Sequence, residues 1–442
     1  MTIPGLHQPT PLTVMSDGTI KQINPFSGTE VWSVPGRGNR PLTKASRTPS
    51  PIDTDGPENY CAFCEARQLA TPPEKSRMVR SGNSWVQLSG LTPEEMANTR
   101  AEFRRVPNLF EIVSYAYWQA NHGYRMDEAT RLRMESYLAA EVGREHVDAI
   151  VDTRLRAAGR DPEHIDDAER TQLRESYFAG GHDVLISRRH FIDGATHDDQ
   201  LASSGTLSID EHRAFIRLAV DSTEDLYARN HYARYVSVFQ NWLSPAGASF
   251  DHLHKQLVAI DSRGVQANEE IARLRLNQNM YNEWGVNFAG YHNLIIAEND
   301  HAVLLVGIGH RYPTVSIYST SANCRPWEHT PEEVDAMSDL IHAAHAATGP
   351  EVPCNEEWHH QPPDLDLPMP WRVNIKWRVS TLAGFEGGTK IYVNTLSPTD
   401  IRDRVVSSLY ALRDEGVISR DIRIATECST RPNRLLYNPN LS

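Results

Sequence analysis

The sequence predicts an α+β fold built from two related halves, because paired β-type runs and capped helices recur in the same way along the chain. In the first half, a helix over about 207–230, capped by Ser208, precedes "ARYVSVFQNW" and "KQLVAID", which bracket a turn as two antiparallel strands would. In the second half, "HNLIIAEND" and "HAVLLVGIG" form a similar pair, and "TPEEVDAMSDLIHAAHAATG" has the pattern of a capped helix. We place the halves at 1–262 and 263–442.

The first half contains a further, highly charged helical stretch. From about 115 to 180 the pattern is helical, as in "DEATRLRMESYLAAEVGREHVDAIVDTRLRAAG", and its mixed charges are typical of a solvated helical insertion rather than a binding element. Ahead of it, residues 90–108 are predicted to form a helix capped by Thr92, followed by a connection. Residues 1–60 are rich in Pro, Gly, Thr and Asn and predict short strands and loops.

Composition narrows the functional classes. The chain has 442 residues, of which 40% are hydrophobic and 23% charged, as in globular proteins with a sizeable core. With a formal net charge of −13, the chain lacks the excess of basic residues that is typical of a protein that coats nucleic acid. We therefore expect no nucleic-acid partner. There is no apolar run of membrane-spanning length and no signal-peptide pattern, and the odd count of five cysteines argues against a disulfide framework. We therefore expect no membrane partner and a cytoplasmic location, and a homodimer is left open.

The stretch "SFDHLHKQLVAID" places three polar side chains at every second position. Residues at i, i+2 and i+4 of a strand share one face, so His252, His254 and Gln256 are expected to point the same way. Two imidazoles and an amide in a row suit either a metal ion or the attack on a phosphoryl group, whereas a surface strand with chance histidines is the alternative. Just upstream, small residues at Gly247 and Ser249 allow backbone N–H groups to approach an anion closely.

Together these residues form the pattern N-x5-G-A-S-x2-H-x-H-x-Q, beginning at Asn241. This pattern resembles the active-site signature of the galactose-1-phosphate uridylyltransferase branch of the histidine triad superfamily, which includes ADP-glucose phosphorylase-like members. Leu253 replaces the proline that is usual between the two histidines. The resemblance implies two histidine-triad-like halves, each an antiparallel sheet with packed helices. It also implies a nucleophile at His254, a phosphoryl-stabilising amide at Gln256, and phosphate or nucleoside contacts from Ser249, Asn241 and the Gly247 turn.

The pair Cys61 and Cys64 in "CAFC" is ambiguous by itself. A redox dithiol is expected at the start of a helix after a strand, and that context is missing, while zinc needs two further ligands. In the family that the chain resembles, the CxxC is joined by a histidine after a strand and by the first histidine of the HxH. Those positions are His190, in "VLISRRHF", and His252. The resemblance thus implies a closed, structural Zn²⁺ site, and the alternative is a pair of loop thiols without metal.

Three other segments resemble substrate-binding parts of the family. "GRGNRP" is similar to an early nucleotide-binding segment, "RVPNLFEIV" to a segment that lines the nucleoside pocket, and "AGFEGGTKIYVN" to a glycine-rich stretch that meets a phosphate. Without the resemblance, "GRGNRP" is equally consistent with an exposed basic turn, and "AGFEGGTKIYVN" with a structural β-turn. The implied substrate-binding residues of the three segments are Arg37, Arg40, Asn108, Phe110, Glu386, Gly388 and Thr389.

The resemblance predicts a nucleotidyltransferase or phosphorylase. A neutral imidazole is nucleophilic near pH 7, and an amide can hold a phosphoryl group without acting as a competing base. The expected reaction moves an NMP group from an NDP-sugar or related nucleotide to His254, and then to a phosphate or a sugar 1-phosphate. The alternatives are a non-catalytic, zinc-stabilised nucleotide-binding protein, a dinucleoside polyphosphate phosphorylase and a nucleotide hydrolase. The base, the sugar and the acceptor are left open.

Overall fold

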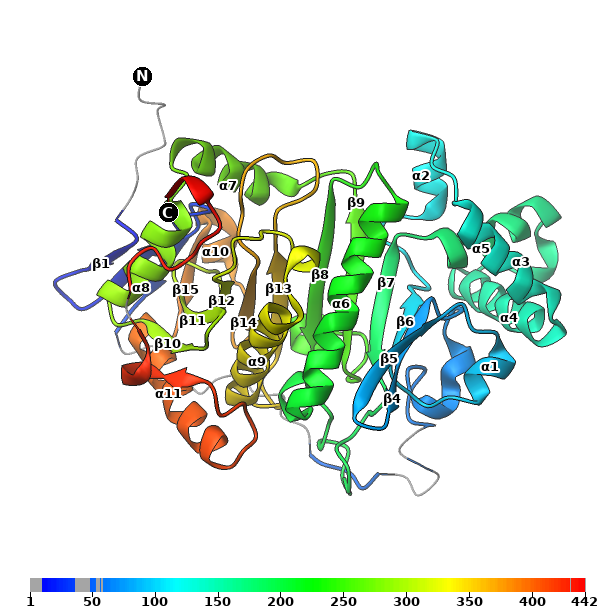
Figure 1. The fold of residues 1–442 in the computed structure, drawn as a ribbon, viewed down its shortest axis with the longest axis horizontal. Helices are drawn as coiled ribbons and strands as arrows, with labels where there is room; N and C mark the ends of the chain where they lie inside the picture. The colour runs from blue at the N-terminus through cyan, green and yellow to red at the C-terminus, as the bar shows by residue number, and fades with distance from the viewer. Residues whose placement is uncertain (1–9, 36–47, 53–55, 57–58, 430, 442) are drawn as a thin grey trace.

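The computed structural model describes residues 10–35, 48–52, 56, 59–429 and 431–441 (Figure 1). Its main feature is one antiparallel sheet. The strands of this sheet are β4 (Ser76–Ser81), β5 (Ser84–Ser89), β6 (Ala101–Pro107), β7 (His182–Ser187), β8 (Tyr235–Trp242), β9 (His254–Ile260), β10 (Ile295–Glu298), β11 (Ala302–Gly307), β12 (Thr314–Ser319), β13 (Cys354–His359), β14 (Arg372–Trp377) and β16 (Arg423–Ile424). They form a 12-stranded sheet in the order β16-β10-β11-β12-β14-β13-β8-β9-β7-β6-β4-β5.

The sheets of the two halves are continuous. Strands β4 to β9 belong to the first half and the other six to the second, and the two groups meet where β13 pairs with β8. In that pairing Asn355 lies opposite Asn241, and Glu357 lies opposite Phe239. The α+β class with two sheet-and-helix halves is thus confirmed, and the halves share one sheet because each offers an edge strand to the other.

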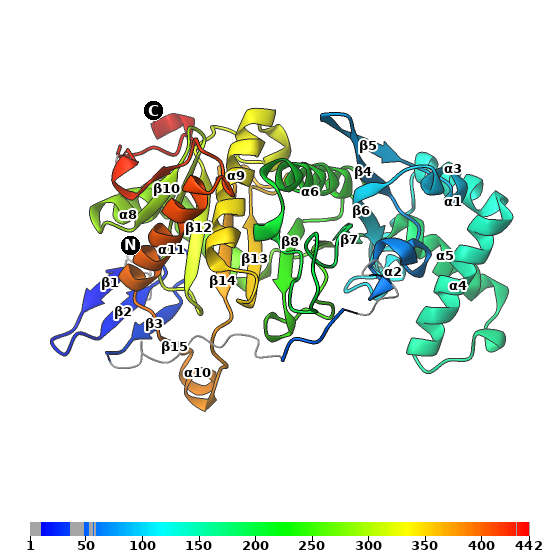
Figure 2. The ribbon, with the colours of Figure 1, turned by 90° about the horizontal axis from the view of Figure 1, so that it is seen from below.

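Helices cover one face of this sheet. Helix α6 (Ile209–Arg229) begins at the predicted cap Ser208, whose side chain forms a capping box with Glu211. Helix α9 (Pro331–Thr348) lies beside it over the central strands, and α11 (Pro398–Asp414) covers the second half (Figure 2). The apolar sides of these helices and the facing side chains of the strands form the main core. The chain between the halves forms α7 (Gly264–Leu276), a short π-helix at Asn282–Asn287 and α8 (Phe288–Tyr291).

A small second sheet brings the two ends of the chain together. It consists of β1 (Leu12–Val14), β2 (Ile20–Ile23), β3 (Glu30–Ser33) and β15 (Ile391–Asn394), and β15 runs parallel to β3. The first three strands therefore pair with a strand of the second half, although we assigned residues 1–262 to the first. Just before β15 lies the short helix α10 (Gly384–Thr389).

The helical insertion forms as expected, with α2 (Tyr115–His122), α3 (Glu128–Ala139), α4 (Glu141–Ala157) and α5 (Asp167–Ala179) at one end of the molecule (Figure 1). It has a small core of its own, which includes Tyr137, Val147 and Phe178. The helix expected over 90–108 is wrong: α1 spans only Pro93–Ala97, and the chain then continues as β6.

The described helices include none that combines the length and the apolar character needed to span a bilayer.

Candidate active site and metal cluster

His254 lies at the start of β9, between β8 and β7, and opposite Ile186 of β7. The next residue, Lys255, is buried on the helical side, where its Nζ lies 5.1 Å from the ring centre of Phe215 in α6. Because side chains alternate along a strand, His254 and Gln256 point to the other face, away from α6 and α9.

The hydrogen bonding of His254 fixes its tautomer. Nδ1 lies 2.7 Å from the carbonyl oxygen of His252, so Nδ1 carries the proton that is donated, and Nε2 keeps its lone pair. The side chain is only 5% exposed, and burial lowers its pKa to about 4. The ring of Phe63 lies against it, with centroids 5.3 Å apart. His254 is therefore a neutral, oriented imidazole near pH 7, which is the form that a nucleophile requires.

Gln256 is oriented by a histidine that the sequence analysis did not identify. The Oε1 atom of Gln256 accepts a hydrogen bond from His182 Nε2 at 3.0 Å. His182 Nε2 carries the proton because Nδ1 accepts the backbone N–H of Ile112, at 3.1 Å, and burial lowers the pKa of this imidazole. Asn108 Nδ2 also approaches Oε1, at 3.5 Å. With its oxygen held on this side, Gln256 presents its NH₂ group as a donor for an anion.

The turn before the histidine strand is tied to the second half. Asn241, on β8, accepts a hydrogen bond from Asn355 Nδ2 at 2.7 Å, and the same amide donates to the carbonyl oxygen of Ala246 at 2.8 Å. Arg378 in turn donates to Asn355 Oδ1 at 2.8 Å. Asn355 and Arg378 were missed because no local pattern shows that residues more than a hundred positions away pair with β8.

The remaining candidates of the first half lie around these groups or outside the described residues. Gly247 ends the short 3-10 helix η5 (Ser244–Ala246) with a φ of +91°, and Ser249 is exposed in the loop that follows. Asn108 contacts His182 as well as Gln256, whereas Phe110 is 57% exposed. Arg37 and Arg40 lie outside the described residues.

The glycine-rich candidates Glu386, Gly388 and Thr389 belong to α10, so the stretch is a short helix and not a β-turn. Helix α10 packs beside β15, on the side of the second half, in both views (Figures 1 and 2). Among the described residues, no hydrogen bond or ion pair joins these three to His254. The structure thus gathers His254 and Gln256 on β9, Asn241 on the adjacent strand β8 and Asn108 just after β6, with α10 beside β15 instead.

The four predicted metal ligands come together beside the histidine strand. The ligand atoms of Cys61, Cys64, His190 and His252 all lie within 4.8 Å of one another. The Sγ atoms are 3.7 Å apart, Cys64 Sγ is 3.5 Å from His190 Nδ1, and Cys61 Sγ is 3.4 Å from His252 Nδ1. A tetrahedral ion with bonds of about 2.3 Å to sulfur and about 2.0–2.1 Å to nitrogen separates its ligand atoms by about 3.3–3.8 Å. The cluster therefore fits a metal site.

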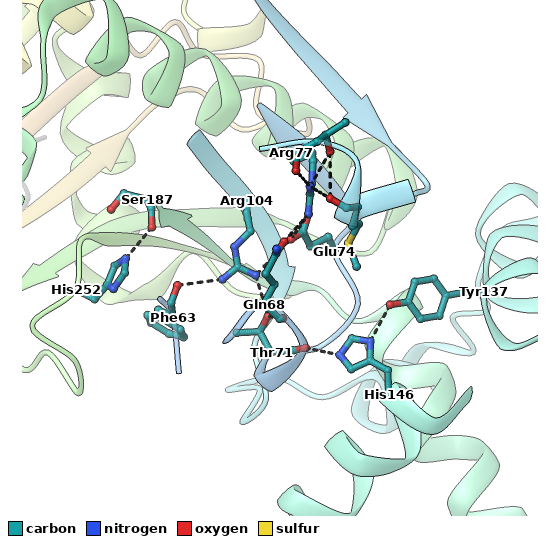
Figure 3. Close-up of polar contacts among 12 residues, drawn as sticks. Phe63, Gln68, Thr71, Glu74, Arg77, Arg104, Tyr137, His146, Ser187 and His252 are labelled. Carbon is teal, nitrogen blue, oxygen red and sulfur yellow. Dashed lines mark hydrogen bonds and ion pairs between the residues drawn. The ribbon is translucent and has the colours of Figure 1, made fainter. Parts of the chain in front are cut away.

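Protonation in the cluster also suits a metal. His252 Nε2 donates to the carbonyl oxygen of Ser187 at 2.7 Å (Figure 3), which leaves Nδ1 facing the cysteines with a free lone pair. The hydrogen bond with Cys61, followed by those with the two histidines, holds the pKa of the Cys64 thiol well below its usual range, against the effect of burial. A thiolate at Cys64 and a neutral imidazole at His252 are the forms in which these two groups bind metal.

The segment after the cysteines is anchored on both sides (Figure 3). Arg104 of β6 donates to the carbonyl oxygen of Phe63 at 3.1 Å and to Thr71 Oγ1 at 3.2 Å. On the other side, His146 of α4 donates from Nε2 to the carbonyl oxygen of Thr71 at 2.9 Å, and its Nδ1 accepts the hydroxyl proton of Tyr137 at 2.7 Å. The sheet and the insertion thus fix the position of the CxxC segment together.

Comparison with known proteins gives relatives of the expected kind. An ADP-glucose phosphorylase from Arabidopsis thaliana is 26% identical over 234 residues, which cover 50% of this chain and 63% of the relative, so the match spans less than two thirds of that protein. The crystal structure of an ADP-glucose phosphorylase from the same plant, with bound ADP-glucose, superposes with a TM-score of 0.55 at 16% identity, over 88% of this chain and 98% of that one. A GalT-like protein of Arabidopsis thaliana superposes equally well, with a TM-score of 0.55 at 17% identity over 87% and 98%.

These matches confirm that the chain has the fold of the uridylyltransferase branch that its histidine pattern resembles. A family model extends over nearly the whole sequence: the model described as "Domain of unknown function (DUF4921)" matches residues 15–437. The chain therefore belongs to the DUF4921 family.

Proposed function

We propose that this protein is a nucleotidyltransferase or phosphorylase in which His254 is the nucleophile. The observation that carries the proposal is the orientation of two neighbouring side chains on β9. His254 is held through Nδ1, so that Nε2 is free to attack, and Gln256 is held through Oε1, so that its NH₂ group is free to donate. The similarity to an ADP-glucose phosphorylase, and to a structure of such an enzyme with bound ADP-glucose, supports an NDP-sugar as donor and makes ADP-glucose the first one to test.

The proposed reaction has two steps. In the first, Nε2 of His254 forms a bond to the α-phosphorus of the donor, the bond from that phosphorus to the bridging oxygen breaks, and sugar 1-phosphate leaves. In the second, an oxygen of the acceptor phosphate attacks the same phosphorus, and the P–N bond breaks to regenerate the imidazole. The carbonyl oxygen of His252, which accepts the hydrogen bond from Nδ1, stabilises the positive charge that the ring gains while it carries the NMP group.

Gln256 and the surrounding polar groups hold the substrate in this proposal. The Gln256 amide donates to a non-bridging oxygen of the transferred phosphoryl group. Asn241 and the turn that contains Gly247 and Ser249 contact the phosphates, and Asn108 and Phe110 border the nucleoside. Two further segments keep the roles that the resemblance implies. Arg37 and Arg40 contact the nucleotide phosphates and the base, and the stretch with Glu386, Gly388 and Thr389 meets the sugar phosphate or the acceptor phosphate.

We further propose that Cys61, Cys64, His190 and His252 hold a structural Zn²⁺ ion. Two thiolates and two imidazoles fill a tetrahedral coordination shell, which leaves no open position for a substrate. His252 supplies both a ligand atom and the carbonyl oxygen that orients His254. The ion would therefore stabilise the loop from which the nucleophile projects.

A phosphorolysis assay tests the function. The purified protein is incubated with ADP-glucose and inorganic phosphate, and the formation of ADP and glucose 1-phosphate is followed. We expect turnover by the wild type, none by His254→Ala, and unchanged turnover by His231→Ala, which removes an exposed histidine outside the site. Activity of His254→Ala at the wild-type rate would contradict the proposal. Release of AMP without an acceptor would instead favour hydrolysis.

A further inference from the structure

A second polar cavity lies on the helical side of the first half. Its volume is ≈ 380 Å³, and it is lined by residues of the β4–β5 hairpin, of β6, of α6 and of α3 in the insertion. Arg105, in its lining, lies opposite Leu185, and Leu185 lies opposite Lys255. Directly opposed residues share a sheet face, so the cavity opens on the face of Lys255 and not on that of His254.

Most charges around this cavity neutralise one another. Lys75 Nζ lies 2.7 Å from Asp183, and Arg105 Nη2 lies 2.6 Å from Asp183 and 2.8 Å from Asp225. Arg229 also pairs with Asp225, at 2.7 Å. Arg229 pairs with Asp127 as well, at 3.0 Å, and together these contacts account for three of the four cationic side chains in the lining.

The fourth cation, Arg133 of α3, stands apart. Its guanidinium donates to the carbonyl oxygen of Glu74 at 3.2 Å and lies 5.3 Å from the ring centre of Phe178. Within the part of the chain that the structure describes, no carboxylate lies at ion-pair distance from it. Burial and then the neighbouring cations Arg229 and Arg105 lower its pKa to about 10, so the guanidinium remains charged at neutral pH without a counter-charge.

An unpartnered hydroxyl lies in the same lining. Ser76 of β4 is 5% exposed, and its Oγ has no hydrogen-bond partner among the described residues. A buried polar group without a partner is costly and signals a missing ligand or water. The lining also contains Asp221 and Asp225, and Asp183 pairs with Lys75 and Arg105, so Arg133 is the cation of this lining whose charge is left for an anion to neutralise.

We propose that this cavity is a second ligand site, which binds a small phosphorylated molecule through Arg133 and Ser76. A guanidinium fork suits the oxygens of a phosphate, and the hydroxyl of Ser76 adds a further donor. At ≈ 380 Å³ the cavity is near the lower end of the usual range for ligand sites. This proposal gives the insertion a role, because α3 supplies the one cation of the described cavity lining that pairs with no carboxylate.

A diffraction experiment tests the site with selenate, a tetrahedral dianion whose selenium is located by its anomalous signal. Crystals of the full chain are soaked in selenate alone, and with an equal concentration of either inorganic phosphate or acetate. We expect a selenium peak between Arg133 and Ser76, which phosphate displaces and acetate does not. The absence of the peak, or its displacement by acetate as readily as by phosphate, would overturn the proposal.

Two variants, each with a matched control, test whether Arg133 and Ser76 bind the anion. Arg133→Gln removes the unpaired charge, and Arg131→Gln on the same helix, which removes an exposed arginine paired with Glu128 and Glu135, is its control. Selenate affinity at the cavity is expected to fall at least about tenfold in Arg133→Gln and to be unchanged in Arg131→Gln. Ser76→Ala, compared with the exposed Ser84→Ala in the same hairpin, tests the hydroxyl separately. Wild-type affinity in both Arg133→Gln and Ser76→Ala would exclude the site.

Discussion

Lys255 and Glu356 form a buried ion pair that joins the two halves directly behind the histidine strand. Nζ lies 2.6 Å from both carboxylate oxygens, and neither side chain reaches the solvent. Burial disfavours ionisation of Glu356, but Lys255 and His345 outweigh it and hold the pKa of this carboxyl below its usual range. Because Lys255 stands between His254 and Gln256, the pair fixes the strand that carries both.

Breaking this pair is expected to destabilise the protein. Lys255→Met leaves the Glu356 carboxylate buried without its cation, which costs about 3–5 kcal/mol of unfolding free energy. The double variant Lys255→Met with Glu356→Leu removes both charges and is expected to recover much of that loss. Urea unfolding of the two variants and the wild type measures the effect. A double variant as unstable as the single one would contradict this account of the pair.

His182 is expected to act on catalysis through Gln256. His182→Ala frees the Gln256 amide to rotate, so kcat should fall by about 10- to 100-fold while KM changes less. Steady-state kinetics of a double-mutant cycle provides the check. If His182 positions Gln256, adding His182→Ala to Gln256→Ala costs little more, whereas fully additive losses would show that the two residues act independently.

Removal of the metal is expected to lower the thermal stability of the protein. Elemental analysis should find about one zinc per chain in the wild type and much less in Cys64→Ser, with Cys428→Ser as a control far along the chain. Loss of the ion leaves the four ligands unlinked, so the melting temperature should drop in Cys64→Ser and after chelation. Wild-type zinc content and melting temperature in Cys64→Ser would contradict a metal site at this cluster.

Glu111 predicts a pH dependence of stability. Burial raises its pKa to about 7, from an ordinary value of 4.5, so the folded state binds this proton more tightly than the unfolded state does. The wild type should therefore lose unfolding free energy as pH rises from about 4.5 to about 7, by up to about 3 kcal/mol. Glu111→Gln has no carboxyl group to titrate at this position. The unfolding free energy of this variant, relative to that of the wild type, should therefore increase as the pH rises across that range. Parallel stability curves for the two proteins would contradict the shifted pKa.

The sequence predicts local features of this fold well. Strands β8 and β9 follow from alternation, and α6 begins at its capping Ser208. The prediction of a helix over 90–108 was wrong because charged residues in this segment hide the alternating pattern of a strand. Phe103 belongs to that strand and packs on Phe215 of α6, with ring centroids 4.7 Å apart. Long-range pairing has no local signal. The contact of His182 with Gln256 depends on strand register, and the contact of Asn355 with Asn241 depends on the joining of the two sheets.

Intact-mass spectrometry shows whether His254 carries the NMP group during the reaction. The wild type and His254→Ala are incubated with ADP-glucose in the absence of phosphate and then digested to locate any label. We expect the wild type to gain the mass of one AMP on the peptide containing His254, phosphate to remove it as ADP, and the variant to gain nothing. An equal adduct on His254→Ala, or turnover by the wild type with no adduct, would contradict this expectation.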